Sequence, residues 1–75
     1  MERYQNLSGR SSITGYEIGE GKIVVEYDDG SAYLFTKGSV GAGSVTEMAR
    51  LARSGYGLYS YIAAVVKKRR AKRIR

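Results

Sequence analysis

Three short segments in the first half of the chain are rich in β-branched and aromatic residues. They cover residues 12–18, 22–27 and 31–36, and turn-forming glycine and aspartate residues separate them. The second segment, Lys-Ile-Val-Val-Glu-Tyr, has the strongest strand character, because its centre is β-branched and its flanks are polar. The pattern predicts three antiparallel strands that follow one another through tight turns.

The turn between the second and third strands determines which side chains share a face of the sheet. Residues 28–31 read Asp-Asp-Gly-Ser, and Asp-Gly readily adopts the positive φ angles of a type I′ turn. With Asp29-Gly30 as a two-residue loop, Val25 lies opposite Leu34. The expected core face then carries Ile23, Val25, Tyr27, Ala32 and Leu34. The expected outer face carries Lys22, Val24, Glu26, Tyr33 and Phe35. A longer loop would shift the register and exchange these assignments.

Two segments in the second half of the chain have the periodicity of amphipathic helices. Ser44 and Glu47 fit a capping box at the start of the first helix. Over residues 45–53 the apolar side chains fall on one side of this helix: Val45, Met48, Ala49, Leu51 and Ala52. The second helix follows residues 54–57 and repeats apolar side chains with helical spacing at Leu58, Tyr61, Ile62, Val65 and Val66.

These elements predict an α+β fold in which two helices pack on one face of a three-stranded antiparallel sheet. A glycine-rich connector, residues 38–44, links the sheet to the first helix, and a basic segment continues the last helix. We expect residues 1–11 to be a flexible lead-in, residues 12–66 to form a single domain, and residues 67–75 to be a basic C-terminal extension.

Length and composition limit how such a domain is stabilised. The chain has 75 residues and contains neither Cys nor His. Disulfides are therefore excluded, and the core of so small a domain supplies only about 3–5 kcal/mol. We expect self-association into a homo-oligomer as additional support. No apolar run approaches the roughly 20 residues of a membrane span, and residues 1–12 do not resemble a signal peptide, so we expect a cytoplasmic protein.

Catalysis receives little support from the residue types. Without His and Cys, the commonest general bases and nucleophiles are missing. Asp28 and Asp29 are adjacent, but the turn explains their presence. We therefore expect a protein that is not an enzyme and has no cofactor or metal.

Basic residues are concentrated at the C-terminus. Residues 67–75 contain seven Lys and Arg and no acid, a charge of +7, whereas residues 1–66 contain six basic and seven acidic residues, a charge of −1. Such a segment releases counterions condensed on nucleic acid. We predict phosphate contacts from Lys67, Lys68, Arg69, Arg70, Lys72 and Arg73. The alternatives are a solvated tail, a contact with an acidic protein and, with less support, an anionic membrane surface.

Two pairs of aromatic residues are candidates for stacking on unpaired bases. Tyr33 and Phe35 alternate along the third strand, and Tyr59 and Tyr61 precede the basic residues. The alternative for such side chains is a place in the core or in a dimer contact.

The glycine-rich connector is a candidate anion site. Gly41, Gly43 and Ser44 lie between a strand and a helix start, where backbone amides could bind phosphate. The Lys-Ser/Thr pair of a Walker A loop is missing, so a simple connector is the alternative.

Several short motifs have the spacing of a known family. They are Ile23-x-Val25-x-Tyr27 and Gly30-Ser31-x-Tyr33-x-Phe35, with Ser11-Ser12 before them and Ser54-Gly55 and Ile62 after them. Over residues 11–66 the chain resembles the KTSC domain family, a small module named from the carboxy terminus of some lysyl-tRNA synthetases. It departs from the family in its longer 38–44 connector and in Leu58-Tyr59, which replaces an aromatic-asparagine pair. The resemblance implies a β-β-β-α fold and a role in RNA binding, with no catalytic residue.

Together these features predict a small non-catalytic module that binds nucleic acid, with RNA or single strands favoured, mainly through the basic segment. Two other classes stay open. One is a small oligomer that binds or sequesters a soluble nucleotide between its subunits. The other is an adaptor or inhibitor that docks on an acidic protein surface.

Overall fold

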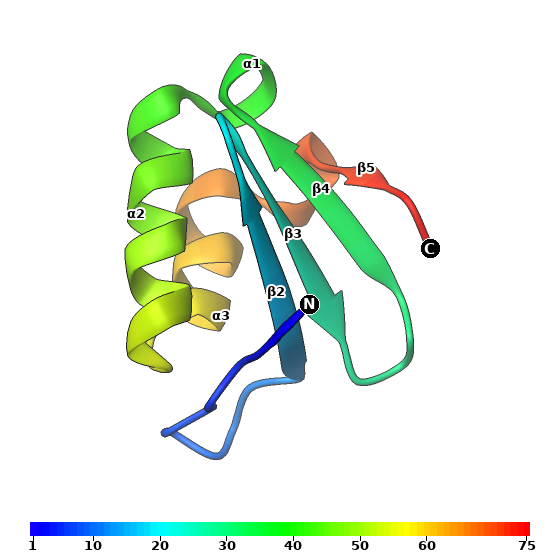
Figure 1. Cartoon of the computed structure of the whole chain (residues 1–75), viewed down its shortest axis with the longest axis vertical. Helices are drawn as coiled ribbons and strands as arrows, with labels where there is room; N and C mark the ends of the chain where they lie inside the picture. Colours follow the sequence, from blue (N-terminus) through cyan, green and yellow to red (C-terminus); the bar gives the residue numbers. More distant parts are fainter.

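The computed structural model describes residues 1–75, except for the side chain of Arg69. It is an α+β fold of two layers, in which helices cover one face of an antiparallel sheet (Figure 1). This part of the prediction is confirmed, but the expectation of three strands is wrong. The sheet has five strands, which lie side by side in the order of the sequence: β1 (Glu2–Arg3), β2 (Ile13–Gly19), β3 (Lys22–Tyr27), β4 (Ala32–Thr36) and β5 (Lys72–Arg73).

The two additional strands are the edges of the sheet, β1 and β5. Each has only two residues, and all of these side chains are exposed. Segments of this kind have no alternation of apolar and polar residues, so periodicity does not reveal them. They are held by backbone pairing with the exposed edges of β2 and β4. Because β5 lies in the segment expected to continue the last helix, the predicted helical extension is wrong as well.

The turn between β3 and β4 is one residue longer than expected. The Gly30 N–H donates to the Tyr27 carbonyl (3.0 Å), and the Tyr27 N–H donates to the Ser31 carbonyl (2.8 Å). These bonds leave residues 28–30 as a three-residue loop. Gly30 has a φ of +87°, the left-handed conformation that the last residue of such a loop requires.

The longer loop exchanges the faces of β4. Val25 pairs with Tyr33 instead of Leu34, and Ile23 pairs with Phe35. Since paired residues share a face, Tyr33 and Phe35 lie on the face covered by the helices. The expected register is therefore wrong, and the structure has the exchanged assignment that a longer loop produces.

The connector after β4 is mostly helical. It forms the short helix α1 (Lys37–Val40) and the first turn of α2 (Ala42–Ser54). The predicted Ser44–Glu47 capping box is wrong, since α2 begins after Gly41 without a side-chain cap. A capping box lies at α1 instead, where Thr36 and Ser39 exchange backbone-to-side-chain hydrogen bonds, both of 3.2 Å.

The core lies between the sheet and the helices. From α2 it receives the predicted side chains Val45, Met48, Ala49 and Ala52. Met48 and Leu58 are completely buried, and they meet an equally buried set from the sheet: Ile23, Val25 and Phe35.

The last helical segment widens before it ends. It comprises α3 (Leu58–Tyr61), a π-helical turn η1 (Ile62–Val66) and a 3₁₀ turn η2 (Lys68–Arg70). The Lys67 N–H donates to the Ile62 carbonyl at 2.7 Å, which is the i→i+5 bond of a π-helix. Val66 is buried, but Val65, which was expected in the core, is 53% exposed.

Lys67 ends this helix and redirects the chain. Its φ of +66° is uncommon for a residue with a side chain. After it the chain turns back through η2 and runs antiparallel to β4 as β5 (Figure 1). The basic segment therefore lies against the sheet instead of projecting from it.

Candidate nucleic-acid interface

Strand β5 brings the basic segment beside β4. Arg73 pairs with Tyr33, and Lys72 pairs with Leu34. Beyond the strand, Ala32 exchanges backbone hydrogen bonds with Ile74 (2.9 Å) and Arg75 (3.1 Å). Arg73 and Tyr33 therefore share the helix-covered side of the sheet at its edge, while Lys72 lies on the opposite side.

Lys68 contacts two tyrosine rings. Its Nζ lies 4.3 Å from the centre of the Tyr27 ring and 4.6 Å from the centre of the Tyr33 ring. The two rings meet edge to face, with their centres 5.7 Å apart. An ammonium group at this distance is attracted to the negative faces of the rings, typically by about 0.5–2 kcal/mol. The cation and the aromatic side chains thus form one cluster.

Tyr59 extends this cluster onto α3. Its side chain is 45% exposed. Together with Tyr27 and Lys68 it lines a hollow of about 160 Å³, which Ser12, Ile62 and Ala63 complete. The hollow offers an aromatic wall and a cation at one place, where a planar anionic group could bind.

Burial raises the pKa of the Tyr27 hydroxyl to about 12, and the neighbouring hydroxyls of Tyr59 and Tyr33 add to this effect. A charged phenolate at Tyr27 would lose its hydration inside the cluster. The hydroxyl therefore stays protonated at neutral pH.

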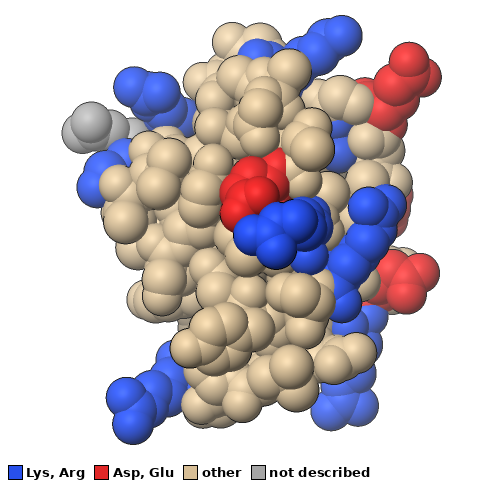
Figure 2. Space-filling model, turned by 90° about the vertical axis from the view of Figure 1, so that its left-hand side faces the viewer, with Lys and Arg blue, Asp and Glu red and all other residues tan. Residues whose placement is uncertain are grey.

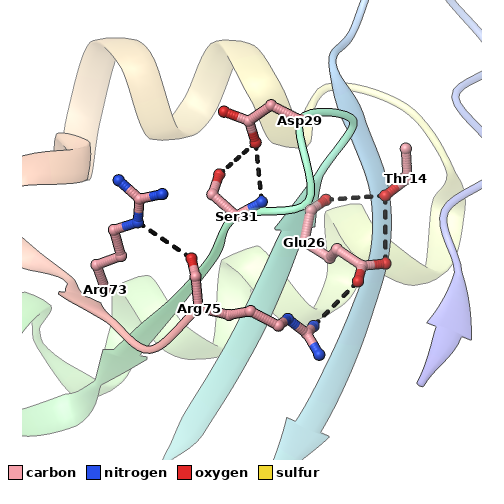
Figure 3. Close-up of polar contacts among 6 residues, drawn as sticks. All are labelled: Thr14, Glu26, Asp29, Ser31, Arg73 and Arg75. Atoms are coloured by element: carbon pink, nitrogen blue, oxygen red, sulfur yellow. Dashed lines mark hydrogen bonds and ion pairs between the residues drawn. The ribbon is translucent and has the colours of Figure 1, made fainter.

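The carboxylate of Asp29 lies near Lys68 and Arg73. Asp29 accepts hydrogen bonds from the N–H (2.9 Å) and the hydroxyl (2.5 Å) of Ser31 (Figure 3). These bonds lower the pKa of Asp29, and the charges of Lys68 and Arg73 contribute less. The carboxylate is thus held in the hairpin loop and partly balances the positive field.

The end of the chain is anchored across the outer face of the sheet. The guanidinium of Arg75 forms an ion pair with Glu26 at 3.0 Å, and Thr14 donates to the other carboxylate oxygen of Glu26 at 3.3 Å (Figure 3). The Nε of Arg73 donates to the Arg75 carbonyl at 3.0 Å. Arg73 and Arg75 are therefore partly engaged within the chain.

The predicted interface residues fall into two groups. Tyr33, Tyr59 and Lys68 come together in the cluster, and Arg73 lies at its edge. Three further cations, Lys67, Arg70 and Lys72, are exposed outside it. The side chain of Arg69 lies outside the described residues.

Two of the predicted stacking residues lie outside the cluster. Phe35 is completely buried in the core, and Tyr61 is half-buried and packs against it. The cluster includes instead Tyr27, which was expected on the core face of the sheet and is confirmed there as a core residue. Tyr27 is buried with only 5% of its surface exposed, and its position beneath Lys68 depends on a fold-back that the sequence does not signal.

The candidate anion site at the connector lies within helical structure. The Gly41 N–H already donates to the Lys37 carbonyl at 3.0 Å. Gly43 and Ser44 belong to the first turn of α2, where a Cβ built on Gly43 would meet open space. These residues lie at the start of α2, beside α1, and form no common hollow with the Lys68 cluster.

Charge is mixed over the side of the molecule that carries α2. Figure 2 shows Lys and Arg side chains spread around the outline of this side, with acidic side chains among them. On α2 itself, Arg50 pairs with Glu47 at 2.6 Å. Cations on this side are therefore interspersed with carboxylates, and Arg50 is paired with one of them.

A search of protein-family models, of curated proteins and of solved structures gives no match to this chain. None of the described helices is long and apolar enough to cross a membrane. Self-association, an acidic protein partner, a cytoplasmic location and the lack of catalysis stay predictions.

Proposed function

We propose that this protein binds single-stranded nucleic acid, with RNA favoured, through the Lys68 cluster and the cations around it. The observation that carries the proposal is the position of the Lys68 ammonium against two tyrosine rings, next to the exposed ring of Tyr59. Proteins that bind unpaired strands combine cations for the phosphates with aromatic rings for the bases. The resemblance to the KTSC family supports the choice of RNA.

The shape of the basic segment supports single strands over a duplex. A basic helix that projects from a domain can enter the major groove of DNA, whereas here the segment is folded along the edge of the sheet. Exposed cations remain on it at Lys67, Arg70 and Lys72. They give the segment an electrostatic attraction for a phosphate backbone that does not depend on sequence.

Point substitutions test the proposal better than deletion of the tail, because deletion would also remove β5 from the sheet. Binding of an unpaired RNA oligomer is measured over a salt series for the wild type, Lys68→Gln and Tyr59→Leu. We expect Tyr59→Leu to cost about 1–3 kcal/mol of binding energy, the usual loss for one stacked base. We expect Lys68→Gln to weaken binding and to reduce the salt slope by about 0.7, the contribution of one phosphate contact on a single strand.

Matched controls separate these effects from loss of folding. Lys37→Gln removes the same charge from an exposed position on α1, and Tyr59→Phe keeps the ring. Both are expected to bind as the wild type does. If RNA fails to bind at low salt, or if neither test variant differs from its control, the proposal is wrong.

A further inference from the structure

A second hollow lies between the N-terminal loop and the junction of α2 with α3. Its volume is about 630 Å³, within the range of roughly 300–1,000 Å³ typical of small-molecule sites. The loop is held in place because the Leu7 N–H donates to the Gly55 carbonyl at 2.7 Å. Gly55 has a φ of +77°, and a Cβ there would lie 2.6 Å from the Cβ of Gln5. This close contact fixes the N-terminal loop against the α2–α3 junction, so the hollow between them is a fixed part of the fold.

Two of its walls are exposed aromatic rings. Tyr56 and Tyr59 line the hollow, and 62% and 45% of their surfaces are exposed. Rings that remain exposed beside a concave surface are suited to stacking on a planar ligand. Tyr59 also lines the smaller hollow beside Lys68, so this one ring separates the two hollows.

The polar lining favours an anion with several hydroxyl groups. Arg10 is the charged residue of the lining, and it forms no ion pair with any carboxylate among the described side chains. Three serine hydroxyls, from Ser8, Ser11 and Ser60, complete the polar part. A guanidinium without a carboxylate partner is a natural ligand for phosphate.

Tyr4 contributes a hydrogen-bond donor. Its ring is 4% exposed, and its hydroxyl accepts a hydrogen bond from the Leu58 N–H at 3.2 Å. Within the described part of the chain, this hydroxyl donates no hydrogen bond. Since Tyr4 lines the hollow, a ligand there would supply the missing acceptor.

We propose that this hollow binds a single nucleotide unit. The base stacks on Tyr56 and Tyr59, the phosphate binds Arg10, and the serine and Tyr4 hydroxyls bind the sugar and the base edge. The inference rests on the proposed function, because Tyr59 would connect this unit to a strand that continues toward Lys68. The hollow would also contact the base itself and so make binding selective for the base, whereas the basic segment alone contacts only phosphates.

A titration followed by NMR tests the site with defined probes. The probes are a nucleoside 5′-monophosphate, the same nucleoside without phosphate, inorganic phosphate, and a short 5′-phosphorylated RNA. We expect the monophosphate to bind more tightly than the nucleoside or inorganic phosphate, with shifts of the amides around Tyr56 and Ser60. Arg10→Gln is expected to weaken monophosphate binding about tenfold or more, since it removes a charge-assisted hydrogen bond. Tyr56→Leu should weaken it by a similar factor.

The controls are Arg53→Gln, which removes an exposed guanidinium from α2, and Tyr56→Phe, which keeps the ring. Both should bind as the wild type does, and thermal unfolding shows that each variant is folded. If inorganic phosphate binds as tightly as the monophosphate, or if Arg10→Gln and Tyr56→Leu match their controls, the nucleotide site is overturned.

The titration with RNA distinguishes failure of the nucleotide site from failure of the proposed function. If RNA binding is unchanged by Arg10→Gln and Tyr56→Leu but weakened by Lys68→Gln, the nucleotide site in the hollow is wrong and the proposed function stands. Binding of the monophosphate without binding of RNA overturns the proposed function, and it identifies the hollow as a site for a free nucleotide.

Discussion

The ammonium group of Lys68 lies 4.3 Å from the centre of the Tyr27 ring and thereby joins the basic segment to the sheet. Two other contacts also join the basic segment to the sheet: the pairing of β5 with β4 and the ion pair between Arg75 and Glu26. The basic segment is therefore part of the fold. Consequently, substitutions within it are expected to affect stability as well as binding.

The contribution of Lys68 to stability is the first prediction. Lys68→Gln removes the cation from the two rings and should lower the free energy of unfolding by about 0.5–2 kcal/mol. In a domain of this size, 1 kcal/mol lowers the melting temperature by roughly 4–8 °C. Urea denaturation measures the change, with Lys37→Gln as the control. Equal stabilities of the two variants would show that the ring contacts contribute nothing.

Alkaline pH provides a second prediction, which concerns Tyr27. The ordinary pKa of a tyrosine is 10.0, and burial raises that of Tyr27 to about 12 in the folded protein. Below pH 10 both states keep the proton, so the contribution of Tyr27 to stability is complete. Between pH 10 and pH 12 only the unfolded state ionises, and the free energy of unfolding falls by roughly 2–3 kcal/mol.

Comparison with Tyr27→Phe isolates this effect, because the other tyrosines and the lysines titrate in both proteins. We expect the difference in stability between the two proteins to be constant below pH 10 and to change steadily above it. Phenolate absorbance provides an independent measurement. If every tyrosine of the folded protein ionises near pH 10, then Tyr27 is not desolvated as described.

Much of the fold could be predicted from the sequence, because it depends on local periodicity. The β-branched centre of β3 and the apolar side of α2 each indicate their own element. The register of the β3–β4 hairpin could not be predicted, since Asp-Asp-Gly permits a loop of two or of three residues. The bonds from Ser31 to Asp29, at 2.9 and 2.5 Å, accompany the longer loop.

The candidate site was harder to predict than the fold. Tyr59 precedes the basic segment in the sequence, but nothing in the sequence brings Tyr27 or Tyr33 to Lys68, because these contacts depend on two non-local events. These are the one-residue change of register and the fold-back at Lys67, which adopts a φ of +66° without a glycine to signal it. The hollow around Arg10 likewise combines two segments that are remote in sequence. No local pattern contains this information.

The ion pair between Glu26 and Arg75 provides a third prediction. Both side chains are partly exposed, so we expect a coupling free energy of about 0.2–1 kcal/mol. A double-mutant cycle with Glu26→Gln and Arg75→Gln measures it, and the value should decrease as salt is added. A coupling that is absent at low salt would show that this ion pair does not help to hold the end of the chain on the sheet.

The π-helical turn at residues 62–66 gives the last prediction, for which the chain offers a matched pair of adjacent valines. Val66 is 2% exposed and Val65 is 53% exposed. Val66→Ala should therefore lower the free energy of unfolding by about 1.5–3 kcal/mol, because two buried methyl groups are lost and a cavity is left. Val65→Ala should change it by less than about 0.5 kcal/mol, as is usual for surface positions.

This pair distinguishes the widened turn from a regular helix. In a regular helix that starts at Leu58, Val65 and Val66 would both lie on the apolar side, at positions i+7 and i+8. Both substitutions would then destabilise the protein. The wider π turn keeps Leu58, Ile62 and Val66 in line and turns Val65 outward. A similar loss of stability at both positions, measured by urea denaturation, would contradict the widened turn and, with it, the fold-back that brings Lys68 to Tyr27.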